Sequence, residues 1–455
     1  MRIEYYAGGR KRRVALEAGP LAVSGRRSLR DDDPIRMVRA EAGETSVIAT
    51  GTLSVSDAPA EEIVWLRRRF GMTPVAEGSH GKVLLSAPLD AGDPVRLVAR
   101  AAVAIFERGT VGSAQPNFLR LMAEPEPEPV EAAESTEGEA DGQWALDNLG
   151  RPGVIGADVA ARAAWTITRG DPDVRVAVLD DGVDTAHPYL KSGVVAERDF
   201  RDADDVAAPR GNDAHGTACA GIICSRDDDL RGLAPDVSLV VCRIGGRSPA
   251  GWLADDFAVA DAVDWCWDTA GSAVLSNSWG GGPPSDLVLL AFDRARTRGR
   301  GGLGSVVVAA AGNSQASSVL YPGDAADVLT VGASNQWDER KTRSSRDGET
   351  NWGSNSGPGL DLMAPGVRIR TTDVAGPAGS SPGLSTGRFN GTSAATPFVA
   401  AAAAMVLSVA PELTEAAVRT TLTGTADSMG PSGWDPAVGF GRLNVFRALR
   451  AARRG

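Results

Sequence analysis

Short apolar runs recur along the second part of this 455-residue chain, and helical stretches separate them. The runs lie at residues 174–179, 238–243, 273–276, 305–310 and 328–331, with helical patterns at 253–268 and 286–297. Short runs with little polar alternation are typical of strands that are buried on both faces. The alternation predicts an α/β fold with a mostly parallel sheet and helices on both of its faces.

Residues 124–142 divide the chain. They read Glu-Pro-Glu-Pro-Glu-Pro and continue with further acids and small residues. Such a segment cannot bury a core, so we predict an extended, solvated linker. The linker also carries part of the net charge of −11. The expected organisation is therefore an N-terminal domain at 1–123, the linker at 124–142 and a larger domain at 143–455.

The N-terminal domain has its own order of elements. The patterns predict strands at 45–55 and 81–87, helices at 60–70 and 93–106, and a last extended segment at 111–122. If one strand escapes the pattern, the order is β-α-β-β-α-β, which predicts a small α+β ferredoxin-like domain. Gly8 and Gly9 lie between two further extended runs and indicate an added hairpin.

Three polar residues in the larger domain have the chemistry of a hydrolytic triad. Asp180 follows the apolar run 174–179, His215 begins His-Gly-Thr, and Ser393 lies in Gly-Thr-Ser-Ala-Ala-Thr-Pro. A serine hydroxyl is a weak nucleophile until a base removes its proton, and an imidazole can do this when a carboxylate orients it. Each segment alone is more often a turn, but the three together favour a site that transfers acyl groups.

The chain order Asp, His, Ser and these local contexts resemble the subtilisin-like serine proteases (subtilases, peptidase family S8) from Gln143 to the C-terminus. The resemblance implies a serine endopeptidase, a hydrolase that cleaves peptide bonds through an acyl-enzyme. It assigns Asp180, His215 and Ser393 as catalytic residues and Asn313 as the side chain that donates to the oxyanion. The amide of Ser393 would be the second oxyanion donor.

Several segments are more similar to the kexin and furin branch of that family. Asp181 directly follows the catalytic aspartate, and residues 275–280 resemble the substrate strand of kexins. The acids expected soon after Gly280 and a C-terminal P-domain are not seen in the sequence, so cleavage after basic residues does not follow. The substrate-binding residues implied by the resemblance are Asp181, Ser278, Trp279, Gly280, Ala310 and Gly312.

The resemblance also implies a role for residues 1–123. A propeptide-like domain would assist folding and block the cleft as an intramolecular inhibitor, and a recognition domain that is never removed is the alternative. A second function is therefore an autoinhibited binding or regulatory module that linker cleavage activates. A third is an esterase or peptide ligase that uses the same acyl-enzyme.

No cofactor is expected to be required. For Asp227–Asp229 the alternatives are a structural calcium loop and a solvated acidic turn, and Tyr189 stands where the resemblance would place a calcium-binding aspartate. The expected partners are protein or peptide substrates, not nucleic acid or a membrane, because basic residues are scattered and the apolar run 398–410 is too short to span a bilayer.

The N-terminus has no apolar signal core, so the expected location is cytoplasmic, with export by another route left open. The four cysteines match no zinc-binding pattern. Cys219 lies four residues after His215, where some subtilases carry a buried free thiol, and an inert core thiol is the simpler interpretation.

Overall fold

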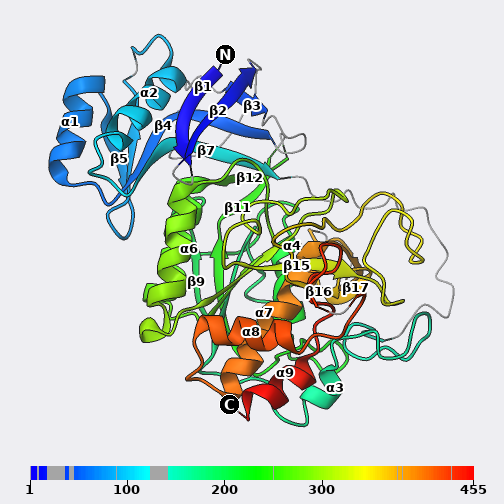
Figure 1. Ribbon diagram of the computed structural model, residues 1–455. Coiled ribbons are helices and arrows are strands. Elements are labelled where there is room, and N and C mark those ends of the chain that lie inside the picture. The colour runs from blue at the N-terminus through cyan, green and yellow to red at the C-terminus, as the bar shows by residue number, and fades with distance from the viewer. Residues whose placement is uncertain are drawn as a thin grey trace.

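The computed structural model describes residues 2–7, 10–17, 36–39, 46–88, 90–122, 142–248, 251–376, 378–381, 383–431 and 433–454. A smaller N-terminal part, up to residue 122, lies against a larger part that begins at residue 142 (Figure 1). The predicted linker falls outside the described residues apart from Gly142.

A parallel sheet of seven strands forms the centre of the larger part. Its spatial order is β16-β15-β14-β13-β8-β10-β9. The strands are β8 (Arg175–Asp180), β9 (Val194–Asp199), β10 (Ser238–Arg243), β13 (Val274–Asn277), β14 (Val306–Ala310), β15 (Leu329–Ser334) and β16 (Leu362–Pro365). All the ladders are parallel, as the apolar runs predicted.

Helices cover both faces of this sheet, and β8 shows why its sequence is apolar throughout. Val176 and Val178 point into one core, which contains α4 (His215–Cys224) and α7 (Thr392–Val409). Ala177 and Leu179 point into a second core with α5 (Asp256–Asp264) and α6 (Asp286–Arg298). Since successive side chains of a strand alternate between faces, a strand between two helix layers has no polar face.

Smaller elements complete the larger part. They are α3 (Ala161–Ala164), α8 (Glu415–Gly424), α9 (Val445–Ala452), a π-helical turn (Trp265–Thr269), a 3-10 turn (Arg300–Gly302) and an antiparallel pair, β17 (Ile369–Thr372) and β18 (Ser385–Phe389). Among the described helices, α7 alone is long and apolar enough to cross a membrane, but 89% of it is buried inside the protein. Its burial makes it a core helix, although it is longer than the apolar run 398–410 that the sequence showed.

The N-terminal part has the predicted β-α-β-β-α-β order. Its elements are β4 (Ser46–Ser56), α1 (Ala60–Phe70), β5 (Thr73–Glu77), β6 (Val83–Ser86), α2 (Pro94–Phe106) and β7 (Ser113–Met122), with spatial strand order β7-β4-β6-β5. The missed strand is β5, which escapes the pattern because it contains Pro74 and is almost wholly exposed. The predicted hairpin is present as β1 (Arg2–Ala7) and β2 (Arg10–Glu17), and β3 (Arg36–Arg39) joins β2 to β4.

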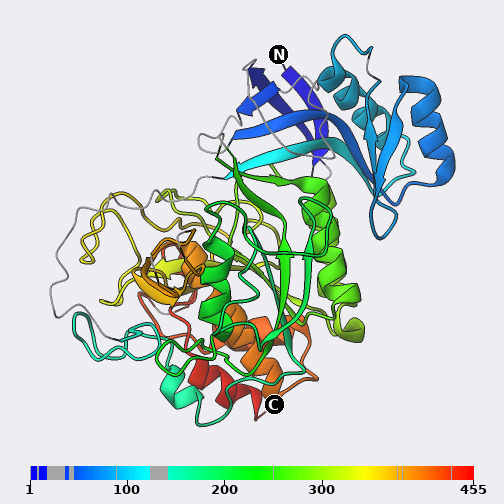
Figure 2. The same ribbon diagram turned by 180° about the vertical axis from the view of Figure 1, so that it is seen from behind.

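One sheet runs through both parts of the molecule. Strand β7 pairs with β4 on one side and, through its last residues, with β12 (Gly251–Asp255) of the larger part. β12 pairs in turn with β11 (Gly245–Ser248). Figures 1 and 2 show β7 leading from the N-terminal part to β12, beside α6.

Buried polar contacts hold the two parts together. Gln115 donates to Ser285 Oγ at 2.6 Å, and Asn117 donates to Asp255 Oδ2 at 2.8 Å. Lys82, with none of its side chain exposed, pairs with Asp264. Because each of these groups was desolvated on docking, the contacts fix the position of the N-terminal part as well as its orientation.

Candidate active site

The carboxyl end of β8 brings Asp180 to His215. Asp180 Oδ1 lies 2.8 Å from His215 Nδ1 and also accepts from the backbone N–H of Asp181 at 2.8 Å. His215 is the first residue of α4, so the strand end and the helix start meet at this hydrogen bond. The carboxylate is almost fully buried, whereas 19% of the imidazole side chain is exposed. One nitrogen of the ring is therefore fixed and the other remains available.

The electrostatics of His215 follow from this contact. Burial alone lowers the pKa of the imidazole, but the charge of Asp180 opposes it, and the net pKa lies well above its ordinary value. The edge of the imidazole also packs against Phe389, with ring centroids 5.3 Å apart. Asp180 is thus placed to stabilise a protonated imidazolium, the form that a histidine takes after it accepts a proton.

Ser393 lies in the first turn of α7. Gly391, just before the helix, has φ = 113°, a left-handed conformation that favours glycine. The first amides of a helix have no partner within the helix, so Ser393 occupies a region of partial positive charge. Its hydroxyl donates to the Ser278 carbonyl at 3.0 Å.

Pro397 explains a second link between Ser393 and the neighbouring strand. Proline has no N–H, so the carbonyl of Ser393, four residues earlier, receives no helical hydrogen bond. That carbonyl accepts instead from Ser278 Oγ at 2.9 Å and from Cys219 Sγ at 3.7 Å. The proline in the Ser-Ala-Ala-Thr-Pro motif therefore frees a carbonyl that links α7 to Ser278, directly after β13, and to Cys219 of α4.

Cys219 contacts both His215 and Ser393. The sulfur lies 3.9 Å from His215 Nδ1 and 3.7 Å from the Ser393 carbonyl oxygen. In this structure the Ser393 hydroxyl donates to the Ser278 carbonyl rather than to His215. Such contacts are commonly loose without substrate. Burial raises the pKa of the Cys219 thiol, so the sulfur stays protonated and does not compete as a nucleophile.

Asn313 has the orientation that an oxyanion donor needs. Its Oδ1 accepts from Thr392 N at 2.8 Å and from Thr392 Oγ1 at 3.0 Å. Because Thr392 N can only donate, the amide oxygen must face α7 and Nδ2 must face the other way. Among the described residues, Nδ2 has no hydrogen-bond acceptor, so it is free to meet a developing negative charge.

The segments expected to bind substrate lie together beside Ser393. The Ser278 hydroxyl donates to the Ser393 carbonyl, and the Ser393 hydroxyl donates to the Ser278 carbonyl. Gly280 is so close to the Tyr321 carbonyl that an added side-chain carbon would lie 2.8 Å from it, and one at Gly312 would collide with Leu320. Ala310 ends β14 with 5% of its surface exposed. The indole of Trp279 instead stacks on Phe292 inside the second core, so only the backbone of Trp279 can face a peptide.

Asp181 does not occupy the place that the resemblance implied. Its carboxylate is fully buried and accepts from the backbone N–H groups of Gly216 at 2.7 Å and His215 at 3.2 Å. It therefore holds the N-terminus of α4, where an anion is favourable, rather than a basic side chain of a substrate. Burial, and then the neighbouring charge of Asp180, raise the pKa of Asp181 well above its ordinary value.

Sequence reasoning also missed partners that the fold supplies. Thr392 orients Asn313, and Phe389 packs on the imidazole. Thr392 lies in the Gly-Thr-Ser segment, so the sequence indicated that this segment belongs to the site, but it did not indicate that Thr392 orients Asn313. Nothing in the sequence indicated that Arg120 of the N-terminal part would pair with Asp256, 136 positions away, next to this site.

The acidic loop at Asp227–Asp229 does not fit a calcium cage. Asp227 Oδ1 accepts from the backbone N–H groups of Asp229 at 3.0 Å and Leu230 at 3.1 Å, which makes it a turn residue. Asp228 is 92% exposed and pairs with Arg231. A hard cation needs six or more converging oxygens. Among the residues that the structure describes, these three carboxylates do not form a group whose ligand atoms lie within 4.8 Å of one another.

A second acidic group is filled by cations of the chain itself. Arg243 Nη1 lies 2.7 Å from Asp199 and 2.6 Å from Asp202, and Arg210 Nη1 lies 2.7 Å from Asp202. In the described part of the chain, one group of three His, Cys, Asp or Glu side chains has ligand atoms within 4.8 Å of one another, namely Asp180, His215 and Cys219. This group is the candidate catalytic cluster, not a set of oxygen ligands.

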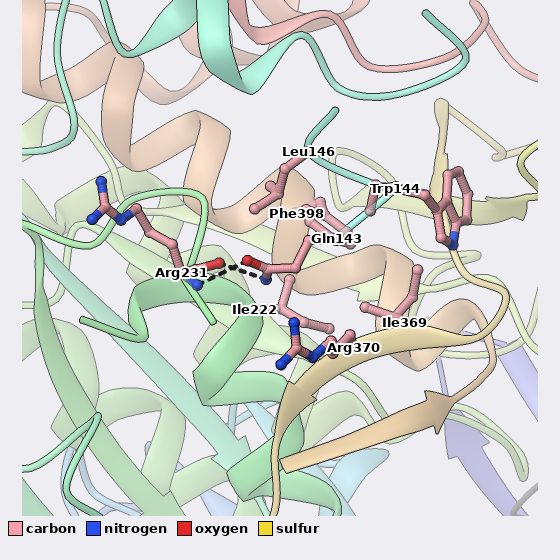
Figure 3. A pocket seen from close by; sticks show the side chains of 9 residues that line it. Gln143, Trp144, Leu146, Ile222, Arg231, Ile369, Arg370 and Phe398 are labelled. Atoms are coloured by element: carbon pink, nitrogen blue, oxygen red, sulfur yellow. Dashed lines mark hydrogen bonds between the residues drawn. The ribbon is translucent and has the colours of Figure 1, made fainter. Parts of the chain in front are cut away.

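A shallow hollow lies apart from the three candidate catalytic residues. Figure 3 shows its lining, where the Gln143 side chain donates to the Arg231 carbonyl at 2.7 Å and accepts from the Arg231 N–H at 2.8 Å. Trp144 and Phe398 contribute apolar walls. None of Asp180, His215 or Ser393 lines this hollow, so it is separate from the candidate catalytic residues.

Comparison with known proteins places the chain in a family. The profile of the subtilase family, peptidase family S8, matches residues 171–441, and the chain belongs to that family. Subtilisin Savinase from Lederbergia lenta is 34% identical over 61% of this chain and 91% of its own length. A solved protease structure from Pseudoalteromonas arctica has a TM-score of 0.57 at 24% identity and covers 68% of this chain and 97% of that chain, which confirms the predicted fold.

Other relatives are matched over a smaller share of their length. A thermophilic serine proteinase from Bacillus sp. (strain AK1) is 32% identical over 63% of this chain and 64% of that protein. A calcium-dependent protease from Nostoc sp. is 32% identical over 68% of this chain, and the match covers 51% of that protein. The chain thus spans between half and two thirds of these two relatives.

Proposed function

We propose that this chain is a serine endopeptidase that hydrolyses peptide bonds through an acyl-enzyme. The observation that carries the proposal is the 2.8 Å contact between Asp180 and His215 at one side of Cys219, with Ser393 at the start of α7 on the other. Membership of the subtilase family supports the same reaction. The protein substrates would be extended segments that lie along residues 278–280.

The proposed reaction assigns each group a role. Ser393 Oγ forms a bond to the carbonyl carbon of the peptide while its proton moves to His215 Nε2. The carbonyl oxygen becomes an oxyanion that Asn313 Nδ2 and the Ser393 N–H stabilise. His215 then gives the proton to the departing amine as the C–N bond breaks, and water releases the acyl group by the same route. Asp180 orients the imidazole and stabilises its charged form.

The proposal is tested by digestion of a peptide library with the full-length protein, read by mass spectrometry, beside labelling with a fluorophosphonate probe. We expect internal cuts and one label on Ser393. A protein that is labelled and releases ester products but cuts no peptide would support the esterase alternative. Absence of both labelling and cuts before and after linker cleavage would overturn the enzyme assignment.

Replacement of Asn313 tests the oxyanion site separately. Asn313→Ala should lower kcat by about 10²–10³-fold with little change in KM, because the lost hydrogen bond strengthens only in the transition state. Steady-state kinetics on a peptide substrate provide the measurement. The exposed Asn351→Ala serves as the control and should keep normal kcat. An Asn313→Ala protein with kcat within threefold of the parent would remove this residue from the mechanism.

We also propose that residues 1–123 act as an intramolecular inhibitor and folding aid. The support is that the end of β7 pairs with β12, and that Gln115, Asn117 and Lys82 make buried contacts with the larger part. Arg120 of β7 donates to the Gly281 carbonyl at 2.7 Å, so this end of the N-terminal part lies beside the segment 278–280 along which we propose that a substrate binds. N-terminal sequencing of fully active protein tests it, because an intact Met1 would reject obligatory maturation.

The same contacts favour a second candidate function, an autoinhibited regulatory module. A domain fastened by buried hydrogen bonds and an ion pair leaves slowly. In this case the probe would label the intact chain weakly and would label it strongly after the linker at 124–142 is cut. Equal labelling before and after the cut would exclude this regulation.

We propose that the chain is related to the kexin and furin branch of the subtilase family, but this relationship does not identify the residue after which it cuts. Residues 275–280 carry the likeness to the kexin substrate strand. Asp181, however, is occupied with the N-terminus of α4 and offers no oxygen to a basic side chain. The library digest decides the matter, because cuts after paired basic residues would support that branch.

Removal of divalent cations should have little effect. The acids at 227–229 form a turn and those around Arg243 are already ion-paired, so we propose that neither group needs calcium. Addition of excess EDTA should shift the melting temperature by less than about 2 °C, which for a chain of this size corresponds to less than about 2 kcal/mol. Calorimetry in EDTA and in millimolar CaCl₂ gives the comparison. A rise of 5 °C or more in calcium would contradict the proposal.

A further inference from the structure

Two buried cysteines meet between the central sheet and the segment that follows α5. Cys242 lies on β10, and Cys266 lies in the π-helical turn Trp265–Thr269. Their sulfur atoms are 3.3 Å apart, and neither residue has any exposed surface. A disulfide bond is about 2.05 Å long, so the two sulfurs need to approach by about 1.2 Å to form one. The fold therefore holds two thiols, 24 positions apart in the chain, close to bonding distance.

Packing on the second face of the sheet keeps the two sulfurs together. Cys242 points into the second core, which also contains Val263 and Cys266, and a closely packed core leaves its side chains little freedom to separate. The two remaining cysteines lie on the other face of the sheet. Cys219 and Cys224 both belong to α4, where residues five apart lie on different sides of the helix. All four cysteines are described, and Cys242 with Cys266 is the one sulfur–sulfur contact among them.

The turn that carries Cys266 is also a surface on which the N-terminal part docks. The ring of His80 stacks on Trp267, the residue after Cys266, with ring centroids 5.3 Å apart. Lys82 pairs with Asp264, two residues before Cys266. A covalent link from Cys266 to β10 would therefore fasten this docking surface to the central sheet.

Formation of a disulfide needs a two-electron oxidant, and a small-molecule disulfide such as oxidised glutathione supplies it. One protein thiolate attacks a glutathione sulfur, a mixed disulfide forms and a glutathione thiolate leaves. The second protein thiolate then attacks the protein sulfur of the mixed disulfide, so that the bond between Cys242 and Cys266 forms and the second glutathione thiolate leaves. The protein loses two electrons and two protons, which the two molecules of reduced glutathione carry away.

The closed structure protects the pair from rapid reaction. Burial, and then the hydrogen bond with Cys242, raise the pKa of the Cys266 thiol well above its ordinary value. Because the thiolate is the form that reacts, the enclosed pair reacts slowly while the turn stays closed. Local opening of the turn admits the reagent. The pair is therefore expected to respond to prolonged rather than brief exposure to an oxidant.

We propose that Cys242 and Cys266 are a redox modification site, which a small-molecule disulfide converts into a disulfide bond. The bond links β10 to the turn on which the N-terminal part docks, and it stabilises the larger part. This inference is independent of the proposed peptidase function, because neither cysteine belongs to the candidate catalytic residues. The alternative is a pair of thiols that only fill the core.

The first test is a peptide map of the full-length protein after incubation with millimolar oxidised glutathione. The protein is first treated with the fluorophosphonate probe, which prevents self-digestion, and is incubated about 10 °C below its melting temperature, where local opening is frequent. Free thiols are blocked with N-ethylmaleimide in denaturant, and the protein is digested without reduction. We expect a peptide pair that joins Cys242 to Cys266. Recovery of these two cysteines in any form other than this linked pair would overturn the proposal.

The second test measures the effect of the bond on stability. Closure of a loop of about 25 residues should raise the melting temperature by about 3–4 °C for a chain of this size. Calorimetry compares each protein before and after treatment, so that the cost of a substitution cancels. Cys266→Ala should show no rise, whereas the control Cys224→Ala, which removes a buried thiol of the other core, should rise as the parent does. A linked parent that melts where the reduced parent melts, or an equal rise in Cys266→Ala, would overturn the stabilising role.

Hydrogen exchange reports whether the turn itself is held. The N–H of Ala270 donates to the Trp265 carbonyl at 2.9 Å, and the N–H of Ser272 donates to the Cys266 carbonyl at 2.8 Å. Both amides should exchange at least about tenfold more slowly in the linked protein, because opening of the turn then requires β10 to move with it. Unchanged exchange at both amides would overturn the claim that the bond fastens the docking surface.

Discussion

Ser393→Ala should reduce kcat for peptide hydrolysis by about 10⁶-fold, because no other group near His215 can take the acyl group. The buried Cys219 thiol is the nearest alternative, and its raised pKa keeps it protonated. The variant should also lose all fluorophosphonate labelling. Steady-state kinetics and mass spectrometry of the probe adduct provide the two measurements.

Folding of the variant is checked by its melting temperature, since the Ser393 hydroxyl makes one hydrogen bond, to Ser278. Ser408→Ala is the matched control. It lies on the same helix, its hydroxyl donates to the Ala404 carbonyl at 2.8 Å, and it should retain full activity. Labelling of the Ser393→Ala protein at the level of the parent would show that another residue is the nucleophile.

Asp180→Asn should lower kcat by about 10⁴-fold and change how the rate depends on pH. The amide can still occupy the site, but it does not hold the imidazole in the tautomer with a free Nε2. General-base catalysis needs neutral His215, so kcat/KM is lost as pH falls through the pKa of the imidazole. Since Asp180 holds that pKa well above its ordinary value, the acidic limb of the parent should lie above about pH 6.5.

Without the carboxylate, burial is the largest influence left on the imidazole, and it lowers the pKa by more than the contact with Cys219 raises it. The acidic limb of Asp180→Asn should therefore move to lower pH. Profiles of kcat/KM between pH 5 and 10 give the comparison, and the exposed Asp173→Asn, just before β8, is the control. A variant limb at the pH of the parent would mean that a different group titrates.

The sequence predicted the fold and the three central residues for a physical reason. Asp180 and Ser393 each lie at an end of a strongly apolar element, and His215 begins another. Such elements are recognisable one at a time, and a parallel sheet gathers its carboxyl ends at one edge. The helix bounds at Ala60–Phe70 were predicted correctly because the pattern and the Gly71 stop are local.

Features that depend on distant contacts were not predicted. Asp181 could have faced a substrate or the protein, and only the packing of α4 against β8 decides that its oxygens meet the amides of His215 and Gly216. The pairing of Arg120 with Asp256 joins residues 136 positions apart, and neither residue has a local signal. In β5 the short, exposed strand is specified by its neighbour β6 rather than by its own sequence.

The continuous sheet has a consequence for handling the protein after the N-terminal part is released. Separation of β7 from β12 would leave two open edges, each with a row of unpaired N–H and C=O groups. Open edges recruit any extended chain, including other copies of the same molecule. The uncut form should therefore remain monodisperse at concentrations where a freshly separated preparation begins to form oligomers, and storage as the intact chain would protect the protein from self-association.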